Sequence, residues 1–449
     1  MVAQRAFLVL WAALAACLAC RPAEERRPDV IVYLVDTLRA DHLGCYGYPR
    51  ATSPSIDAFA AESILFEDAV AQSAWTRPAV TSLLTGLDPR SHGVQERLDG
   101  LPESFDTLPE ILRREGYQTA AFVSSAVITA KFGFDQGFDV FRQRVKETIE
   151  PERPTSEWVN EEALRWLDRR RPDRPFFLFL HTLDPHMPYR PPEPHRRRLA
   201  PDADPRAGRL EQVVALRDGL RPASARDRKE IAALYDAEIA GNDAAFGRLV
   251  ADLRARSLFD PLLLVFVSDH GEEFFDHGGW EHGATLYQEL VHIPLLLKLP
   301  RGAGAGRRIG DTARQVDVLP TVLDVLGGEI PERIQGRSLL PLLQASPRRP
   351  VPAFSFLALD GRRIESAVVG NRKLIHTLAH DRRPAGVELY DLVADPGERR
   401  NLAAADPAAV QGLSWLLERR ARIGAPPQAP PVSLDPELEE QLRALGYVR

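Results

Sequence analysis

Short, unbroken runs of apolar residues recur along the chain and predict strands that are buried on both faces. Unbroken runs, as opposed to alternating ones, are typical of parallel strands covered by helices on each side. Helices are expected between them at residues 107–115, 156–170 and 229–256. The predicted strands are Val30–Val35, Pro175–Leu180, Leu262–Val267 and Ile293–Leu297. The pattern predicts an α/β fold with a mostly parallel central sheet sandwiched by helices.

The pattern changes at about residue 350, where shorter stretches separated by turn residues predict antiparallel hairpins. They are Glu365–Val369, Lys373–Thr377 and Glu388–Leu392. We therefore expect a main domain over 29–349 and a small C-terminal antiparallel α+β subdomain over 350–425. A proline-rich spacer and a terminal helix, Asp435–Leu445, are expected to make up residues 426–449.

The N-terminus has the features of an export signal. The apolar run 6–16 is too short to span a bilayer but suits the hydrophobic part of a signal peptide. It ends in Leu14-Ala-Ala-Cys17, which resembles a bacterial lipobox, in which the cysteine is lipidated. We expect a lipoprotein-type signal peptide over 1–17, a tether over 18–28, and export to a bacterial cell membrane, anchored at Cys17 and facing the periplasm or the cell surface. Plain signal-peptidase cleavage is the alternative.

Charge and cysteine content exclude some classes of protein. The 449 residues carry 63 acidic and 57 basic side chains, a net charge of −6, so no overall positive field attracts nucleic acid. Three cysteines are too few for a disulfide framework. With 44% hydrophobic and 27% charged residues, the chain has the composition of an ordinary globular protein.

Polar side chains stand at the ends of three predicted strands. Asp36 follows the first, His181 the second, and Asp269 with His270 the third. Because ligands bind at the carboxyl ends of parallel strands, we expect these groups to converge. Residues 269–283 also hold three histidines among several carboxylates. The sequence thus predicts a metal site with Asp36, Asp269 and His270 as ligands, the alternative being a loop-capping Asp and a structural His.

Two further segments contain candidate catalytic groups. Thr76 is expected at or near the start of a helix that closes at Gly86, where a metal could make its hydroxyl nucleophilic. A helix cap is the alternative role for Thr76. His181 and His186 lie in a proline-rich loop, where one of them could bind a substrate oxygen or protonate a leaving group. Structural hydrogen bonds are the alternative role for these histidines.

The order of the motifs resembles that of the sulfatase family in the alkaline phosphatase superfamily, over nearly the whole chain beyond the signal. The resemblance implies that 29–349 is a sulfatase-like catalytic domain. The matching segments are Leu38–Asp41, Gly44–Gly47, Leu83–Gly86, Pro89–Val94, Gly116–Thr119, Pro185–Pro188, Ser268–Glu272, Asp317–Thr321 and Glu388–Pro396.

The departures from that family favour phosphorus chemistry. The family's nucleophile falls on Thr76, where sulfatases carry a Cys or Ser that is oxidised to formylglycine; a threonine would give a ketone. Val80 replaces a family arginine, and His282 stands where some relatives have a lysine. The set Asp36, Thr76, Asp269 and His270 is similar to the one-metal site of phosphoethanolamine transferases and lipoteichoic acid synthases, in which a metal-bound threonine attacks a phosphodiester. The motif order also resembles that of nucleotide pyrophosphatase-like phosphodiesterases, which share the threonine nucleophile but use two metals. The resemblance implies one divalent ion, with Mn²⁺ or Zn²⁺ favoured over Ca²⁺.

The resemblance therefore implies a metal-dependent hydrolase or transferase that cleaves phosphate (di)esters through a covalent Thr76 intermediate. His186 and His282 are expected to act in catalysis, and His181, Arg77, His186 and His282 to bind a small-molecule, glycan or lipid-headgroup ester. Two alternatives stay open: a sulfuric ester hydrolase acting on glycan or lipid sulfates, and a catalytically degenerate lipoprotein that binds a glycan or headgroup.

Overall fold

The predicted apolar runs form the middle of a nine-stranded sheet. The computed structural model describes residues 27–144, 154–344, 349–378, 385–422 and 429–444. The predicted signal peptide with Cys17 and part of the spacer therefore lie outside the described residues. The strand order is β10 (Arg308–Ile309), β2 (Ile64–Val70), β9 (His292–Lys298), β6 (Leu263–Ser268), β1 (Val30–Val35), β5 (Phe176–Thr182), β3 (Gln118–Val123) and β4 (Val140–Gln143), with β11 (Ala313–Arg314) also paired to β2.

The sheet is mostly parallel, as predicted. β1 lies at its centre and pairs in parallel with both β5 and β6. β9 runs antiparallel to β6 and to β2. All six residues of β1 are fully buried, with Val30, Val32 and Leu34 in one hydrophobic core and Ile31, Tyr33 and Val35 in the other. An unbroken apolar run is therefore what a strand covered on both faces requires.

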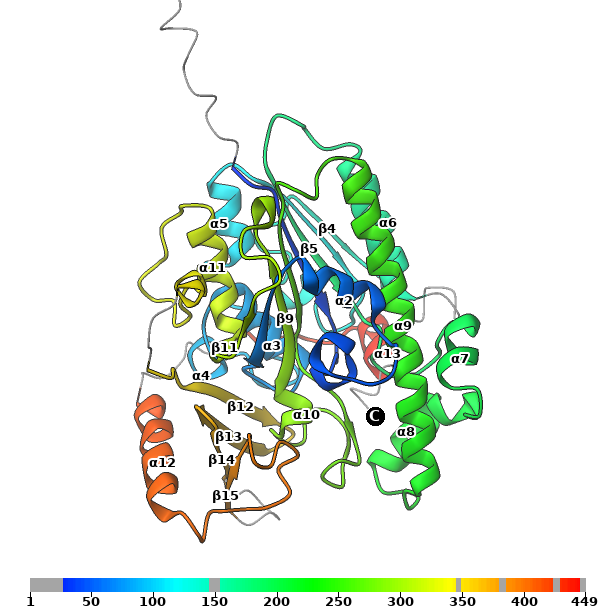
Figure 1. The fold of residues 1–449 in the computed structure, drawn as a ribbon, viewed down its shortest axis with the longest axis vertical. Coiled ribbons are helices and arrows are strands. Elements are labelled where there is room, and N and C mark those ends of the chain that lie inside the picture. The colour runs from blue at the N-terminus through cyan, green and yellow to red at the C-terminus, as the bar shows by residue number, and fades with distance from the viewer. Residues whose placement is uncertain (1–26, 145–153, 345–348, 379–384, 423–428, 445–449) are drawn as a thin grey trace, which may run out of the picture.

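Helices cover the two faces of this sheet (Figure 1). One face carries α3 (Thr76–Thr85), α5 (Leu108–Arg114) and α11 (Val318–Val325), and the other carries α2 (Pro54–Ala61), α6 (Thr155–Leu167) and α9 (Ala225–Ala255). α9 begins four residues before its predicted start because Ser224 and Asp227 form a capping box. The shorter helices are α4 (Pro89–His92), α7 (Glu193–Leu199), α8 (Leu210–Arg217) and α10 (Gln288–Val291). Within the described ranges, no helix combines the length and the apolar character that a membrane crossing needs.

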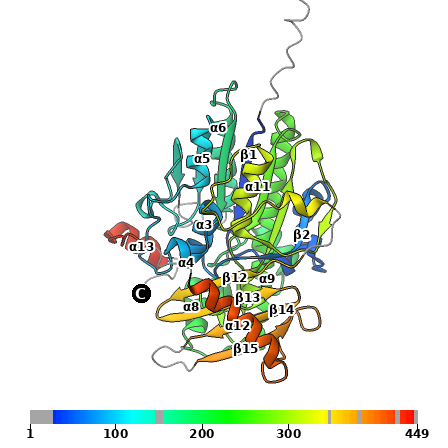
Figure 2. The same ribbon diagram turned by 90° about the vertical axis from the view of Figure 1, so that its left-hand side faces the viewer.

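The C-terminal part forms the predicted antiparallel sheet, with one strand more than the sequence indicated. Its order is β12 (Ala353–Leu359), β13 (Arg362–Val369), β14 (Arg372–Thr377) and β15 (Gly386–Asp391). α12 (Pro407–Ala421) packs on this sheet through Leu413 and Leu417 (Figure 2). α13 (Pro436–Ala444) returns to the main core through Leu438 and Leu442.

β12 joins the small sheet to the main domain. The Phe356 N–H donates to the Gln72 carbonyl at 2.9 Å, and Ser355 Oγ donates to the Ala71 carbonyl at 2.6 Å. Gln72 and Ala71 lie shortly before α3, which begins at Thr76. The C-terminal sheet is thus bonded directly to the segment that leads to the predicted nucleophile.

Candidate metal and ester-binding site

The ends of β1 and β6 bring Asp36, Asp269 and His270 together. Val35 and Ser268 are paired in the parallel register, so the residues that follow them leave the sheet side by side. One ligand atom from each of the three residues lies within 4.8 Å of the others, and all three side chains are fully buried. The structure thus assembles the three residues that the sequence proposed as metal ligands.

Hydrogen bonds hold the backbone at this edge in an uncommon conformation. Thr37 has a φ of +53°, which is unfavourable for a β-branched residue. Its N–H donates to Asp269 Oδ1 at 3.1 Å, and its carbonyl accepts from the Tyr235 hydroxyl of α9 at 2.7 Å. The Leu38 N–H donates to Ser268 Oγ at 3.0 Å. These bonds fix the position of Asp36 relative to Asp269.

The donor atoms of this cluster fit a divalent ion. Asp269 Oδ1 accepts from two backbone N–H groups, whereas its Oδ2 has no hydrogen-bond partner in the part of the chain that the structure describes. His270 Nδ1 lies 2.8 Å from the Gly271 carbonyl, so Nδ1 carries the proton and Nε2 keeps its lone pair. Burial lowers the pKa of His270 to about 4, which keeps the ring neutral, as a ligand must be. A mixed oxygen and nitrogen set suits Mn²⁺ or Zn²⁺ better than Ca²⁺.

Thr76 is the first residue of α3 and faces this cluster. The helix cap is Trp75, and no side chain caps this end of the helix. Thr76 Oγ1 instead lies 3.2 Å from His270 Nε2, and the Thr76 side chain is fully buried. The capping role considered for Thr76 is therefore not what its hydroxyl does. The hydroxyl thus lies beside a nitrogen of the candidate metal-ligand cluster.

His181 lies beside the same cluster. Its Nε2 is 3.7 Å from Asp36 Oδ2, and within the described ranges its ring nitrogens make no hydrogen bond. Burial, with a smaller contribution from His270, lowers the pKa of His181 to about 3. A neutral imidazole here can interact with the ion or with a substrate oxygen.

The three remaining predicted residues are His282 and His186, which lie near the cluster, and Arg77, which contacts other segments. The His282 ring lies tilted against the His270 ring, with centroids 4.5 Å apart, and against the His186 ring, at 5.1 Å. His186 Nδ1 lies 2.6 Å from the Met187 carbonyl. Arg77 points elsewhere: its Nε donates to the Val127 carbonyl at 3.1 Å and its guanidinium lies over the Phe132 ring at 3.5 Å. The histidines surround the cluster, whereas these contacts of Arg77 are structural.

Glu272 and Tyr189, which were not predicted as site residues, form a hydrogen-bonded chain with His282. Glu272 Oε1 lies 2.9 Å from His282 Nδ1, and the Tyr189 hydroxyl donates to Glu272 Oε2 at 3.1 Å. Both residues are buried, and burial raises the pKa of Glu272 to about 8. Glu272 ends the Ser268–Glu272 motif, but its pairing with a histidine ten residues later depends on the short hairpin β7 (Glu273–Phe274) and β8 (Trp280–Glu281).

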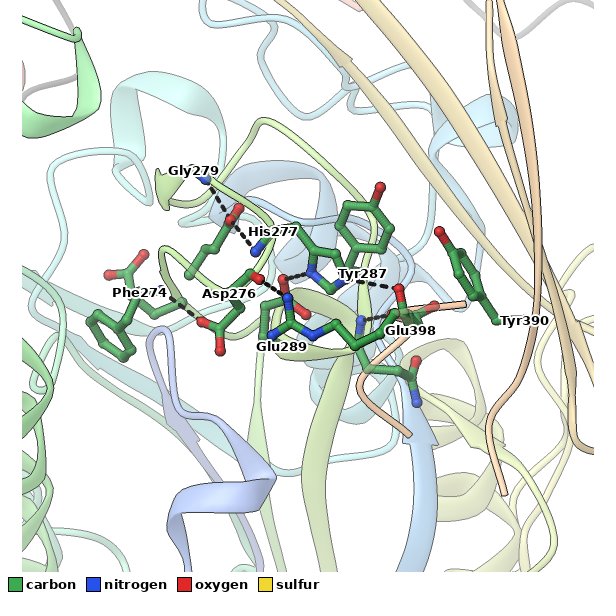
Figure 3. A network of polar contacts seen from close by, with 12 residues as sticks. Phe274, Asp276, His277, Gly279, Tyr287, Glu289, Tyr390 and Glu398 are labelled. Atoms are coloured by element: carbon green, nitrogen blue, oxygen red, sulfur yellow. Dashed lines mark hydrogen bonds and ion pairs between the residues drawn. The ribbon is translucent and has the colours of Figure 1, made fainter. Parts of the chain in front are cut away.

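The C-terminal subdomain is fastened to the same loop (Figure 3). His277 Nδ1 lies 2.6 Å from Glu289 Oε1, and the His277 ring stacks on Tyr287 at 3.6 Å between centroids. Glu398 accepts from the Gln288 N–H at 2.6 Å and forms a fully buried ion pair with Lys373 of β14 at 2.9 Å. The segment after β6 thus begins at Asp269 and His270 and is bound further along by the C-terminal subdomain.

Comparison with known proteins decides the family. The profile described as Sulfatase matches residues 28–328, and the profile described as N-sulphoglucosamine sulphohydrolase, C-terminal, matches residues 276–419. The chain belongs to the sulfatase family. This membership makes it a hydrolase acting on sulfate or phosphate esters, in a superfamily whose members use a divalent metal.

Relatives of this sulfatase-family protein include sulfatases and phosphonate hydrolases. An N-acetylglucosamine-6-O-sulfatase of Bacteroides thetaiotaomicron is 24% identical, with 87% of this chain and 85% of that protein covered. A solved structure in complex with its substrate D-glucosamine-2-N,6-O-disulfate has a TM-score of 0.74 at 22% identity, covering 88% and 97% of the two chains. The phosphonate monoester hydrolase of Agrobacterium radiobacter has a TM-score of 0.72 at 25% identity, covering 88% and 96%.

Proposed function

We propose that this sulfatase-family protein is a metal-dependent hydrolase of phosphate esters, diesters included, that uses the unmodified Thr76 hydroxyl as its nucleophile. The observation that carries the proposal is the 3.2 Å distance between Thr76 Oγ1 and His270 Nε2, next to the carboxylates of Asp36 and Asp269. The proposal is also supported by the start of α3, where no side chain, that of Thr76 included, caps the helix.

Asp36, Asp269 and His270 would hold one divalent ion, with Mn²⁺ or Zn²⁺ favoured, which acts as a Lewis acid and lowers the pKa of the hydroxyl. Thr76 Oγ1 loses its proton to solvent and attacks phosphorus while the bond from phosphorus to the leaving oxygen breaks. A histidine at the cluster, His186 or His282, donates a proton to that oxygen. Water then attacks phosphorus, restores the Thr76 hydroxyl and releases the phosphate product. An alcohol in place of water would make the protein a transferase.

Phosphorus is favoured because of what Thr76 lacks. A formylglycine hydrate carries two hydroxyls on one carbon and can expel its ester by elimination, whereas a threonine ester must be cleaved by attack of water on the central atom. The similarity to a phosphonate monoester hydrolase supports phosphorus as the central atom of the substrate.

A sulfate ester is the second candidate substrate. Its support is the family profile together with the relative that is an N-acetylglucosamine-6-O-sulfatase. The neighbour that binds a disulfated glucosamine supports a glycan as the ester's carrier. In this case Thr76 would attack sulfur, with the same residues in the same places.

Intact-mass measurement separates these candidates. The purified protein, with Mn²⁺ or Zn²⁺ supplied, is mixed with 4-nitrophenyl phosphodiesters, phosphomonoesters and sulfate esters. We expect turnover of a phosphate ester and a phosphoryl adduct located on Thr76. Thr76→Ala should abolish turnover and the adduct, while Thr81→Ala, a buried hydroxyl on the same helix that bonds to the Arg77 carbonyl, should keep both.

The other outcomes each point to a different function. Release of sulfate alone, with activity lost in Thr76→Ala, would replace the phosphate proposal by the sulfatase candidate. Full activity of Thr76→Ala would refute the nucleophile. Metal binding without turnover of any ester would favour the degenerate glycan- or headgroup-binding lipoprotein.

We also propose that the protein is exported and anchored through a lipid on Cys17, on the strength of the apolar run 6–16 and the Leu14–Cys17 sequence. In a bacterial host, the full-length chain should partition with membranes and Cys17→Ser should not. Equal partitioning of the two would refute the anchor.

A further inference from the structure

We infer that Glu272, held by Tyr189, is the positioning residue that makes His282 the proton donor to the leaving group. The inference rests on the proposed function and narrows it, because that function leaves the donor open between His186 and His282. It follows from a difference in what the Nδ1 atoms of three neighbouring histidines contact.

Three of the rings at the site, those of His270, His186 and His282, have a polar contact at Nδ1. His270 Nδ1 contacts the Gly271 carbonyl at 2.8 Å, and His186 Nδ1 contacts the Met187 carbonyl at 2.6 Å. A carbonyl only accepts, so Nδ1 carries the proton in both rings and Nε2 is left with its lone pair. Such a ring suits a metal ligand, as in His270, or an acceptor, as in His186.

His282 differs because its Nδ1 contacts a carboxyl group instead. Glu272 Oε1 lies 2.9 Å from this nitrogen. A carboxyl group can accept the Nδ1 proton or donate its own, so His282 Nε2 can carry a proton and release it while Nδ1 stays hydrogen-bonded. A histidine oriented by a buried carboxylate is the arrangement by which imidazole serves in proton transfer.

The surroundings hold this pair in one geometry. The Tyr189 hydroxyl donates to the second oxygen, Glu272 Oε2, at 3.1 Å, and Glu272 is fully buried. The Gly283 N–H, directly after His282, donates to the Ala74 carbonyl at 2.8 Å. Ala74 precedes Thr76 by two residues, so the predicted donor is tied by a backbone hydrogen bond to the segment that carries the predicted nucleophile.

In the proposed step, the proton on His282 Nε2 moves to the leaving oxygen as its bond to phosphorus breaks. The electron pair of that bond stays on the oxygen, which departs as an alcohol or phenol. As Nε2 releases its proton, Nδ1 takes up the proton of the Glu272 carboxyl group, so the ring stays neutral and Glu272 is left as a carboxylate. Protonation matters most for a poor leaving group, because 4-nitrophenolate can leave without a proton.

Leaving-group dependence tests this role. Wild-type enzyme, Glu272→Gln, Tyr189→Phe and His282→Ala are assayed with 4-nitrophenyl, phenyl and methyl esters of the acid that the wild type cleaves. We expect Glu272→Gln to lose about 100-fold in kcat on phenyl and methyl esters but less than about 3-fold on the 4-nitrophenyl ester. Tyr189→Phe should show a weaker form of the same selectivity.

Two controls separate positioning from structure. The double variant Glu272→Gln with His282→Ala should be no slower than His282→Ala alone, because Glu272 acts through His282. Glu289→Gln removes the carboxylate of the second Glu–His pair on this loop, that with His277, and should leave the leaving-group dependence unchanged (Figure 3).

An equal loss on all esters in Glu272→Gln, a full activity in that variant, or additive losses in the double variant would each overturn the inference. None of these results affects the Thr76 adduct, so the proposed function would stand. Conversely, a wild type without turnover would remove the proposed function before the variants are compared.

Discussion

Replacing Lys373 by methionine should destabilise the protein more than any surface charge change. Lys373 and Glu398 are both fully buried as side chains, with Nζ and Oε1 2.9 Å apart, and Lys373 Nζ also lies 3.2 Å from Gln288 Oε1. Methionine keeps the apolar stem of lysine and leaves Glu398 buried without its cation. Breaking a buried ion pair from one side costs about 3–5 kcal/mol, so this is the loss we expect in the free energy of unfolding.

Two variants calibrate that magnitude. In Lys373→Met with Glu398→Gln, neither position carries a charge and the Gln288 N–H keeps an acceptor, so the loss should fall below about 2 kcal/mol. Arg372→Met removes the neighbouring ion pair with Asp391, at 3.3 Å, from a partly exposed arginine. Exposed pairs contribute about 0–1 kcal/mol, and this control should stay within that range.

Urea unfolding followed by tryptophan fluorescence measures these differences, at pH 8 and again at pH 5.5. Burial raises the pKa of Glu398 and Lys373 lowers it. Without Lys373 the carboxyl group therefore takes up a proton more readily in the folded state than in the unfolded state. The deficit of Lys373→Met should thus shrink as the pH falls. A loss below about 1 kcal/mol at pH 8, or a double variant as unstable as the single one, would refute the assignment of this pair.

Two further predictions concern the candidate metal-ligand cluster and His277 in the loop after β6. Removing the metal with EDTA should lower the melting temperature of the wild type but not that of Asp269→Ala. For an ion present at 100 times its Kd, the lost stabilisation is about 2.7 kcal/mol. Equal shifts in the two proteins would mean that the metal binds elsewhere. Burial opposes protonation of His277, but the hydrogen bond and charge of Glu289 outweigh it and raise its pKa. The stabilisation is therefore complete below the unfolded pKa of about 6.5 and is lost as the pH rises through the raised value. His277→Gln should accordingly flatten the dependence of melting temperature on pH between 6 and 8.5, and parallel curves would contradict this.

The sequence was most informative where strand geometry alone places a residue. Once Val30–Val35 and Leu262–Val267 are identified as buried parallel strands, Asp36 and Asp269 must emerge at the same edge of the sheet, as they do. The start of α5 was also close to its predicted position, one residue away from it, because Thr107 and Glu110 form a capping box. In both cases the local sequence pattern and the tertiary structure favour the same conformation.

The sequence was less informative where tertiary contacts decide. β12 was not predicted. Ser355 and Phe356 of this strand form hydrogen bonds with the segment before α3, and such contacts between distant parts of the chain cannot be seen in the sequence. Glu272 was quoted only as part of a motif, since nothing in its spacing from His282 indicates that a two-residue hairpin folds the two together. The direction of β9 likewise depends on its neighbours β6 and β2, as an apolar run carries no sign of orientation.

The contacts of the β6 loop imply that the C-terminal subdomain is part of the site's construction. Gly283, next to His282, donates to the Ala74 carbonyl, and its own carbonyl accepts from Arg362 of β13 at 3.4 Å. Gly283 has a φ of +74°, and a Cβ there would come within 2.9 Å of Leu359 of β12. The positive φ favours glycine at this position, and any other residue would also require the Leu359 side chain to shift. Because the same glycine also donates to the Ala74 carbonyl, its contacts locate the small sheet, His282 and the segment before Thr76 relative to one another.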